Sequence, residues 1–162
     1  FARYRAQKGF VVHHAPDEAR AEAWVRAAVR DSLPMFASDG ILDGPFGHPR
    51  VVGTFARVLG HYVRDTRDLG LMDALRRMTL APARRLERRV PAMRDKGRVR
   101  VGADADLTLF DPARVIDRAT YREPTLAPAG IPFVLVRGVP VVRDGKPQAG
   151  ALPGRAIRAA IR

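Results

Sequence analysis

Two short polar motifs in the first third of the chain carry side chains that could take part in chemistry. Asp39 follows an apolar run and stands between two small residues, Ser38 and Gly40. If that run is a strand of a parallel α/β fold, Asp39 lies at the end of the sheet where such folds bind ligands. Its carboxylate could then serve as a metal ligand, a general base or both. Taken alone, the spacing favours an ordinary aspartate that caps a turn.

The second motif is His48-Pro49-Arg50, which closes a loop rich in glycine and proline. Pro49 suits the first turn of a helix. A guanidinium at Arg50 would then lie where free backbone N–H groups already attract an anion. Arginine binds a carboxylate through two parallel hydrogen bonds. Arg50 is therefore a candidate for binding a carboxylate, although a surface salt bridge fits the tripeptide equally well.

Two adjacent histidines, His13 and His14, follow an apolar run and could line the same mouth. Adjacent side chains on a strand point to opposite faces, so at most one of them would face a site. A structural or surface role is the simpler interpretation. The sequence has no His-x-His pair, no His-Glu-x-x-His motif and no cysteine. The chain therefore cannot assemble a complete metal centre from clustered ligands.

The elements that must position these residues are predicted from hydrophobic periodicity. Residues 9–13 and 33–37 are short apolar runs typical of buried strands, and residues 17–30 form an amphipathic helix between them. The chain therefore opens with one βαβ unit. We expect further helices at residues 49–65, 71–78 and 82–86.

From about Arg94 the pattern changes to short alternating segments, in which Val99 and Val101 alternate with arginines. Three more strands are predicted, at residues 107–110, 131–136 and 139–142. Turns are predicted at Gly138 and at Asp144-Gly145. An α/β part is thus followed by an antiparallel β module.

The overall composition narrows the possible classes of protein. The chain has 162 residues and a formal net charge of +12. Its arginines are spread over nearly every segment, without a lysine-rich tail or a pattern of aromatic and basic residues. We therefore expect solvated basic faces and no nucleic-acid partner. No apolar run is long enough for a membrane helix, and the lack of cysteine suits a reducing, cytoplasmic location. Because the sequence begins at Phe1, we expect it to be a piece of a longer protein.

Several stretches together resemble one family. Residues 36–40, the His48-Pro49-Arg50 motif and residues 53–65 are similar to the D-aminoacylase group, the N-acyl-D-amino-acid deacylases of the amidohydrolase superfamily. Residues 116–121 and 153–155 resemble the end of the same enzymes. Two other stretches, residues 78–83 and 102–112, fit the wider superfamily.

The resemblance implies a fold. Members of this group are (β/α)₈ barrels with a small β-sandwich domain built from both chain termini. Residues 1–93 would be the last strands and helices of the barrel, and residues 94–162 would be the C-terminal share of the sandwich. The N-terminal barrel segment would then be the missing partner of this chain.

The resemblance also implies an activity, the hydrolysis of N-acyl-D-amino acids to a carboxylic acid and a D-amino acid. Asp39 would bind metal, take a proton from the attacking water and return it to the leaving amine. Arg50 would hold the substrate's α-carboxylate, with His48 as a second substrate-binding residue. One or two zinc ions would be held mainly by residues upstream of this chain, so we expect this segment alone to be inactive.

Two other interpretations remain open from the sequence. Another amidohydrolase could act on a cyclic or linear amide, and a requirement for a free substrate carboxylate would distinguish the deacylase from it. The chain could also be a basic, non-catalytic module that binds polyanions. Steeply salt-dependent binding to heparin or DNA would favour that function.

Overall fold

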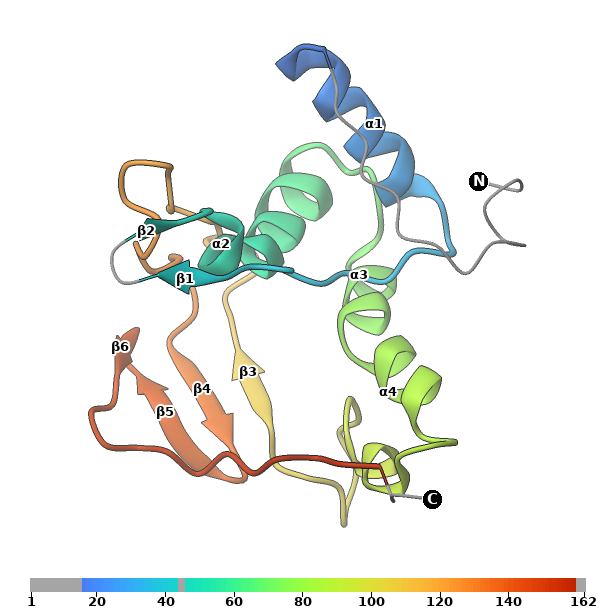
Figure 1. Cartoon of the computed structure of the whole chain (residues 1–162), viewed down its shortest axis with the longest axis vertical. Coiled ribbons are helices and arrows are strands. Elements are labelled where there is room, and N and C mark those ends of the chain that lie inside the picture. Colours follow the sequence, from blue (N-terminus) through green and yellow to red (C-terminus); the bar gives the residue numbers. More distant parts are fainter. Residues whose placement is uncertain (1–15, 44–45, 160–162) are drawn as a thin grey trace.

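The computed structural model describes residues 16–43 and 46–159, which form an array of helices followed by an antiparallel sheet (Figure 1). The helices are α1 (Glu18–Arg30), α2 (Arg50–Arg57), the π-helix η2 (Val58–Asp65), α3 (Leu71–Met78), α4 (Leu80–Leu86) and the 3-10 helix η3 (Pro91–Asp95). The strands are β1 (Leu42–Asp43), β2 (Phe46–Gly47), β3 (Leu107–Leu109), β4 (Phe133–Val136), β5 (Val139–Arg143) and β6 (Lys146–Pro147). This mixture of helices and sheet confirms the expected α/β class.

Helix α1 begins and ends close to its expected bounds. The side chain of Asp17 accepts a hydrogen bond from the backbone N–H of Arg20 at 2.8 Å, which is the contact expected of a helix N-cap. Towards the end of the helix, the guanidinium groups of Arg26 and Arg30 both bind the buried carboxylate of Asp68, at 2.9 Å and 2.6 Å. Hydrogen bonds from Arg26, Thr66 and Arg30 hold the pKa of Asp68 far below its usual value. Helix α1 is thus fixed to the loop that precedes α3.

The apolar run at residues 33–37 is not a strand, which corrects the expected βαβ unit. The segment has no regular secondary structure. The other expected strand of the unit, residues 9–13, lies outside the described residues. A strand exists only where a neighbouring strand supplies hydrogen bonds, and no described strand runs beside this segment. Its backbone is bound instead by a helix, since the N–H of Phe36 donates to the carbonyl oxygen of Arg77 at 3.3 Å.

The guanidinium of Arg77 makes the main contacts that hold this segment in place. The residue is only 1% exposed. Its side chain donates to the carbonyl oxygens of Val29 at 2.6 Å and Pro34 at 2.7 Å, and it stacks on the ring of Phe36 with 4.5 Å to the ring centroid. Arg77 therefore joins α3 to the end of α1 and to the chain that leads to Asp39.

Replacing Arg77 by methionine is expected to lower the free energy of unfolding by about 3 kcal/mol, because the buried carbonyl oxygen of Val29 and the partly buried one of Pro34 lose their donor. Arg76→Met is the matched control, since Arg76 is half-exposed and binds Asp73 at 2.7 Å on the surface. That exposed pair should contribute less than about 1 kcal/mol. Urea midpoints at an unchanged slope measure both values. Equal losses in the two variants would contradict the structural role given to Arg77.

The β module is antiparallel, as expected, and its four strands lie in the order β3-β4-β5-β6. Its two hairpin turns have positive φ at both central residues, 52° and 79° at Arg137-Gly138 and 50° and 73° at Asp144-Gly145. This is the geometry of tight hairpin turns, in which glycine is favoured. The alternating segment before it is not a strand: Val99 and Val101 are fully exposed in an irregular loop.

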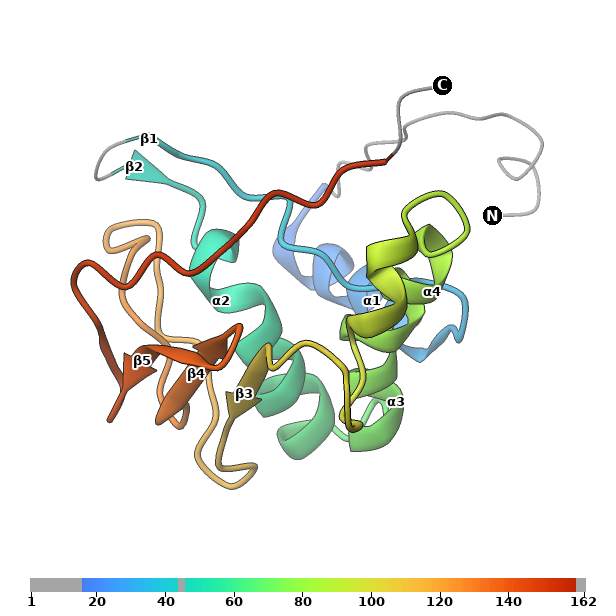
Figure 2. The same cartoon turned by 90° about the horizontal axis from the view of Figure 1, so that it is seen from below.

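The helices and the loop between β3 and β4 share a hydrophobic core. Helix α2–η2 lies between the sheet and the α3–α4 pair (Figure 2). Buried Ala56 and Leu59 pack against Val115, which comes from the loop between β3 and β4 and is fully buried. Gly60 allows this contact, because a Cβ there would lie 2.4 Å from the carbonyl oxygen of Val115. The two ranges expected to be separate domains are therefore in close contact.

Candidate active site

Asp39 projects from the end of the irregular segment beside the start of α2. Its side chain is 83% exposed, so a ligand can reach the carboxylate. Its backbone has a φ of 45°, a left-handed conformation that is uncommon for residues other than glycine. The next residue must be glycine, because a Cβ at Gly40 would lie 2.7 Å from the Cα of Val51. Helix α2 and the Asp39 turn are thus held in close contact, and backbone strain of this kind is frequent at functional sites.

Arg50, the first residue of α2, lies directly beside Asp39. Its Nε donates to the backbone carbonyl of Asp39 at 3.0 Å. Its Nη2 lies 3.6 Å from Oδ2 of the Asp39 carboxylate, and both side chains are well exposed. A pair this open to water is weak, so a ligand carboxylate can replace Asp39 at the guanidinium. The structure thus brings together the two residues that the sequence singled out as candidates.

His48 stands at the same helix start, with both ring nitrogens in contact with protein. The backbone N–H of Arg50 donates to Nδ1 at 3.1 Å. On the other side, Nε2 lies 2.9 Å from the hydroxyl of Tyr121, and the two rings meet edge to face with centroids 5.0 Å apart. Burial and the nearby charge of Arg50 lower the pKa of His48 below its usual value. A neutral imidazole fits these contacts, since one nitrogen must accept.

Tyr121 is a residue of this arrangement that sequence reasoning did not single out. It lies within the stretch 116–121, but it is 73 residues away from His48 along the chain. No local period links two residues at such a distance. The available signal was a tyrosine beside a short turn, which by itself indicates nothing about a site.

A complete metal centre is not formed by the residues that the structure describes. Among them, no group of three or more histidine, cysteine, aspartate or glutamate side chains is placed to hold a metal ion. The exposed carboxylate of Asp39 fits the part of a single ligand. His13 and His14 lie outside the described residues. Asp39 and Arg50 can thus offer one ligand for a cation and, next to it, one binding group for a carboxylate.

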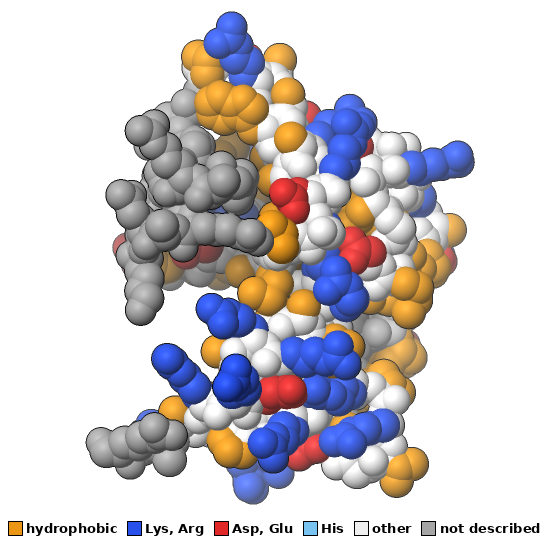
Figure 3. Space-filling view, turned by 90° about the vertical axis from the view of Figure 1, so that its right-hand side faces the viewer, with side chains coloured by type: hydrophobic (Ala, Val, Ile, Leu, Met, Phe, Trp, Pro, Cys, Tyr) orange, Lys and Arg blue, Asp and Glu red, His pale blue; other side chains and the backbone are white. Residues whose placement is uncertain are grey.

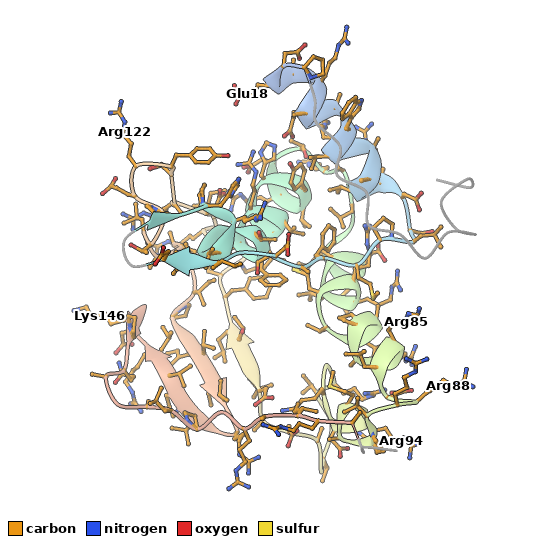
Figure 4. All side chains as sticks on the ribbon, in the orientation of Figure 1. Glu18, Arg85, Arg88, Arg94, Arg122 and Lys146 are labelled. Carbon is orange, nitrogen blue, oxygen red and sulfur yellow. The ribbon has the colours of Figure 1, made fainter. Side chains whose placement is uncertain are left out.

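A basic surface lies away from this arrangement, on the face that carries α4 and η3 (Figure 3). In Figure 4 the side chains of Arg85 in α4, Arg88 in the turn after it and Arg94 in η3 extend outward. Carboxylates occur among the cations, and Glu87 and Asp95 pair with Arg98 and Arg100 at 2.6 Å and 2.9 Å. None of the helices in the described part of the chain is long and apolar enough to cross a membrane.

The model of the amidohydrolase family matches residues 1–142. N-acyl-D-glutamate deacylase from Alcaligenes xylosoxydans xylosoxydans is 44% identical over 134 residues, which is 83% of this chain and 26% of the relative. The chain thus spans about a quarter of the length of this curated relative.

Two solved structures are similar in both sequence and shape. The N-acyl-D-glutamate deacylase of Bordetella bronchiseptica, complexed with zinc and a phosphonate inhibitor that mimics the tetrahedral intermediate, matches with a TM-score of 0.75 and 42% identity. That match covers 85% of this chain and 28% of the other. A D-aminoacylase with a binuclear metal center matches with a TM-score of 0.76 and 38% identity, covering 84% of this chain and 27% of the other.

Proposed function

This chain belongs to the amidohydrolase family, and on that premise we propose that it is the C-terminal quarter of a zinc-dependent N-acyl-D-amino-acid deacylase. The reaction would release a carboxylic acid and a D-amino acid. The single observation that carries the proposal is the placement of Arg50 beside Asp39, with 3.6 Å between the guanidinium and the carboxylate. This arrangement can hold a substrate's acid group next to a proton-transferring residue.

Within the complete enzyme, residues 1–93 would close a (β/α)₈ barrel and residues 94–162 would contribute to a β-sandwich. Two features support this assignment. The segment before Asp39 has no regular secondary structure and no partner strand among the described residues, as expected of a barrel strand that lacks its neighbours. The meander β3-β4-β5-β6 has the antiparallel order of one sandwich layer.

Asp39 would be the proton-transferring residue. A single carboxylate within reach of both the attacking water and the leaving nitrogen can act first as base and then as acid. It would take one proton from water as the new carbon–oxygen bond forms, and give that proton to nitrogen as the carbon–nitrogen bond breaks. Zinc would supply Lewis-acid polarisation and a more acidic water. Asp39 would be one ligand of that metal site, whose remaining ligands would come from elsewhere in the enzyme.

Arg50 would bind the free α-carboxylate of the substrate, with His48 as its neighbour in the same binding loop. Two parallel hydrogen bonds from the guanidinium would fix the acid group and thereby orient the amide towards Asp39. The contact would also discriminate against molecules that lack the acid group, because they would not gain this two-point contact with Arg50. This requirement separates the deacylase from an amidohydrolase that acts on cyclic amides.

The full-length protein that contains this chain is expected to hydrolyse N-acetyl-D-glutamate or another N-acetyl-D-amino acid, and to leave the L-enantiomers intact. Removal of metal by a chelator should abolish turnover, and added zinc should restore it. Release of the free D-amino acid, followed by chiral chromatography, measures this. Faster hydrolysis of a cyclic amide or of a carboxamide than of the corresponding acid would contradict the proposed substrate class.

A further inference from the structure

The imidazole of His48 bridges two parts of the molecule that are distant in sequence. On one side its Nδ1 accepts a hydrogen bond from the backbone N–H of Arg50, the first residue of α2, at 3.1 Å. On the other side it meets the hydroxyl of Tyr121 at 2.9 Å. Because Nδ1 accepts, it carries no proton, and the proton of the neutral ring belongs on Nε2. His48 therefore donates from Nε2 to the Tyr121 oxygen, and the lowered pKa of His48 favours this neutral form.

Tyr121 comes from the loop that joins β3 to β4, and that loop is fixed against α2. The backbone N–H of Thr120 donates to the carbonyl of Glu123 at 3.1 Å, and the N–H of Glu123 donates to Oγ1 of Thr120 at 3.0 Å. These bonds close a small turn that holds Tyr121. Earlier in the same loop, the carboxylate of Asp117 lies 3.5 Å from the guanidinium of Arg57 at the end of α2.

The two contacts of the His48 ring, with Arg50 and with Tyr121, fix the backbone of Arg50. The first backbone N–H groups of a helix have no partner within the helix, and His48 satisfies that of Arg50. The edge-to-face contact of the two rings adds a fixed orientation. The side chain of Arg50 starts from this anchored backbone and reaches the carbonyl of Asp39 at 3.0 Å.

We propose that Tyr121 and His48 are positioning residues that hold Arg50 in place for the substrate's carboxylate, so that the β module contributes to substrate binding. This inference rests on the proposed deacylase function. The position of Asp39 depends on a different segment of the chain, which a hydrogen bond from Arg77 holds against α3. Loss of the bridge should therefore weaken binding of the carboxylate more than it slows proton transfer.

Tyr121→Phe tests the proposal in the full-length enzyme, because it removes the hydroxyl and keeps the ring. The loss of one hydrogen bond should raise KM for N-acetyl-D-amino acids roughly two- to tenfold. The kcat value should stay within about twofold, and KM for the matching carboxamides should not change. Tyr62→Phe is the matched control, since its hydroxyl donates to Glu22 at 3.2 Å, outside the candidate site.

Two substitutions of His48 separate the two contacts. Asparagine can place an acceptor near the position of Nδ1 but is too short to reach Tyr121, so His48→Asn should match Tyr121→Phe. The double variant should be no worse than either single one, since both remove the same contact. His48→Gln reaches towards Tyr121 but loses the acceptor for Arg50, and it should raise KM more.

Hydrogen exchange at the backbone amide of Arg50 measures, independently of activity, how well His48 holds that amide. Exchange should become at least about twofold faster in Tyr121→Phe, because the acceptor of that amide is less well held. An enzyme inactive on every N-acyl-D-amino acid would refute the proposed function. In that case the exchange rate of the Arg50 amide would by itself show whether Tyr121 and His48 hold Arg50 in place. Unchanged KM and unchanged exchange, or equal losses on acid and carboxamide substrates, would overturn the inference.

Discussion

Asp39→Asn in the full-length enzyme is expected to lower kcat about 10²- to 10⁴-fold, which is the usual effect of losing a general acid–base group. The amide of asparagine keeps the shape of the side chain but can neither accept the proton of water nor return it to nitrogen. KM should change much less than kcat, because the carboxylate of the substrate is bound elsewhere. Steady-state kinetics with an N-acetyl-D-amino acid measures both constants.

Asparagine is the right replacement for a structural reason. Asp39 has a φ of 45°, and asparagine tolerates this left-handed conformation better than most residues do. The substitution should therefore leave the turn against α2 intact. Asp43→Asn is the matched control, because Asp43 is exposed in the β1–β2 hairpin a few residues further on. Retention of more than roughly a tenth of the wild-type kcat in Asp39→Asn would identify another group as the base.

The α-helices and the hairpin turns of the β module could be predicted from the sequence because their signals are local, whereas the β1–β2 hairpin and η3 were not predicted. Helix α3 occupies residues Leu71–Met78, where the apolar residues repeat at helical spacing. The turns at Gly138 and Asp144-Gly145 have the positive φ values that those residue types favour. The run at residues 33–37 failed as a strand because strand formation depends on a neighbour, which an apolar pattern cannot supply.

The candidate site was predictable only in part, for a similar reason. Asp39 and Arg50 lie 11 residues apart in the chain, and a short loop rich in glycine and proline returns one to the other. The contact of Tyr121 with His48 depends on how the β module packs on α2, which the sequence does not show. Arg77 gave no signal either, because its burial depends on carbonyl groups at the end of α1 and in the following segment.

Arg50→Ala should reduce kcat/KM for N-acyl-D-amino acids by about 2 to 4 kcal/mol, roughly 30- to 1000-fold, as expected when one partner of a charge pair is removed. Arg50→Lys should recover only part of this loss, because an ammonium group lacks the planar fork that binds both carboxylate oxygens. Arg88→Ala is the matched control, since it removes the same charge from the turn after α4, at a distance from the site (Figure 4). That variant should keep wild-type kcat/KM.

The decisive measurement is a cycle that combines Arg50→Ala with a change in the substrate, from an N-acetyl-D-amino acid to its carboxamide. The carboxamide has no charged acid group, so the wild-type enzyme should already process it poorly and Arg50→Ala should cost little more. A coupling energy of about 2 kcal/mol or more between the two changes would locate the substrate's carboxylate at Arg50. A coupling energy near zero would make Arg50 a structural or surface residue. The pairing of Arg50 with Asp39 would then serve only to hold α2 against the Asp39 turn, and the proposed substrate class would lose the contact on which it depends.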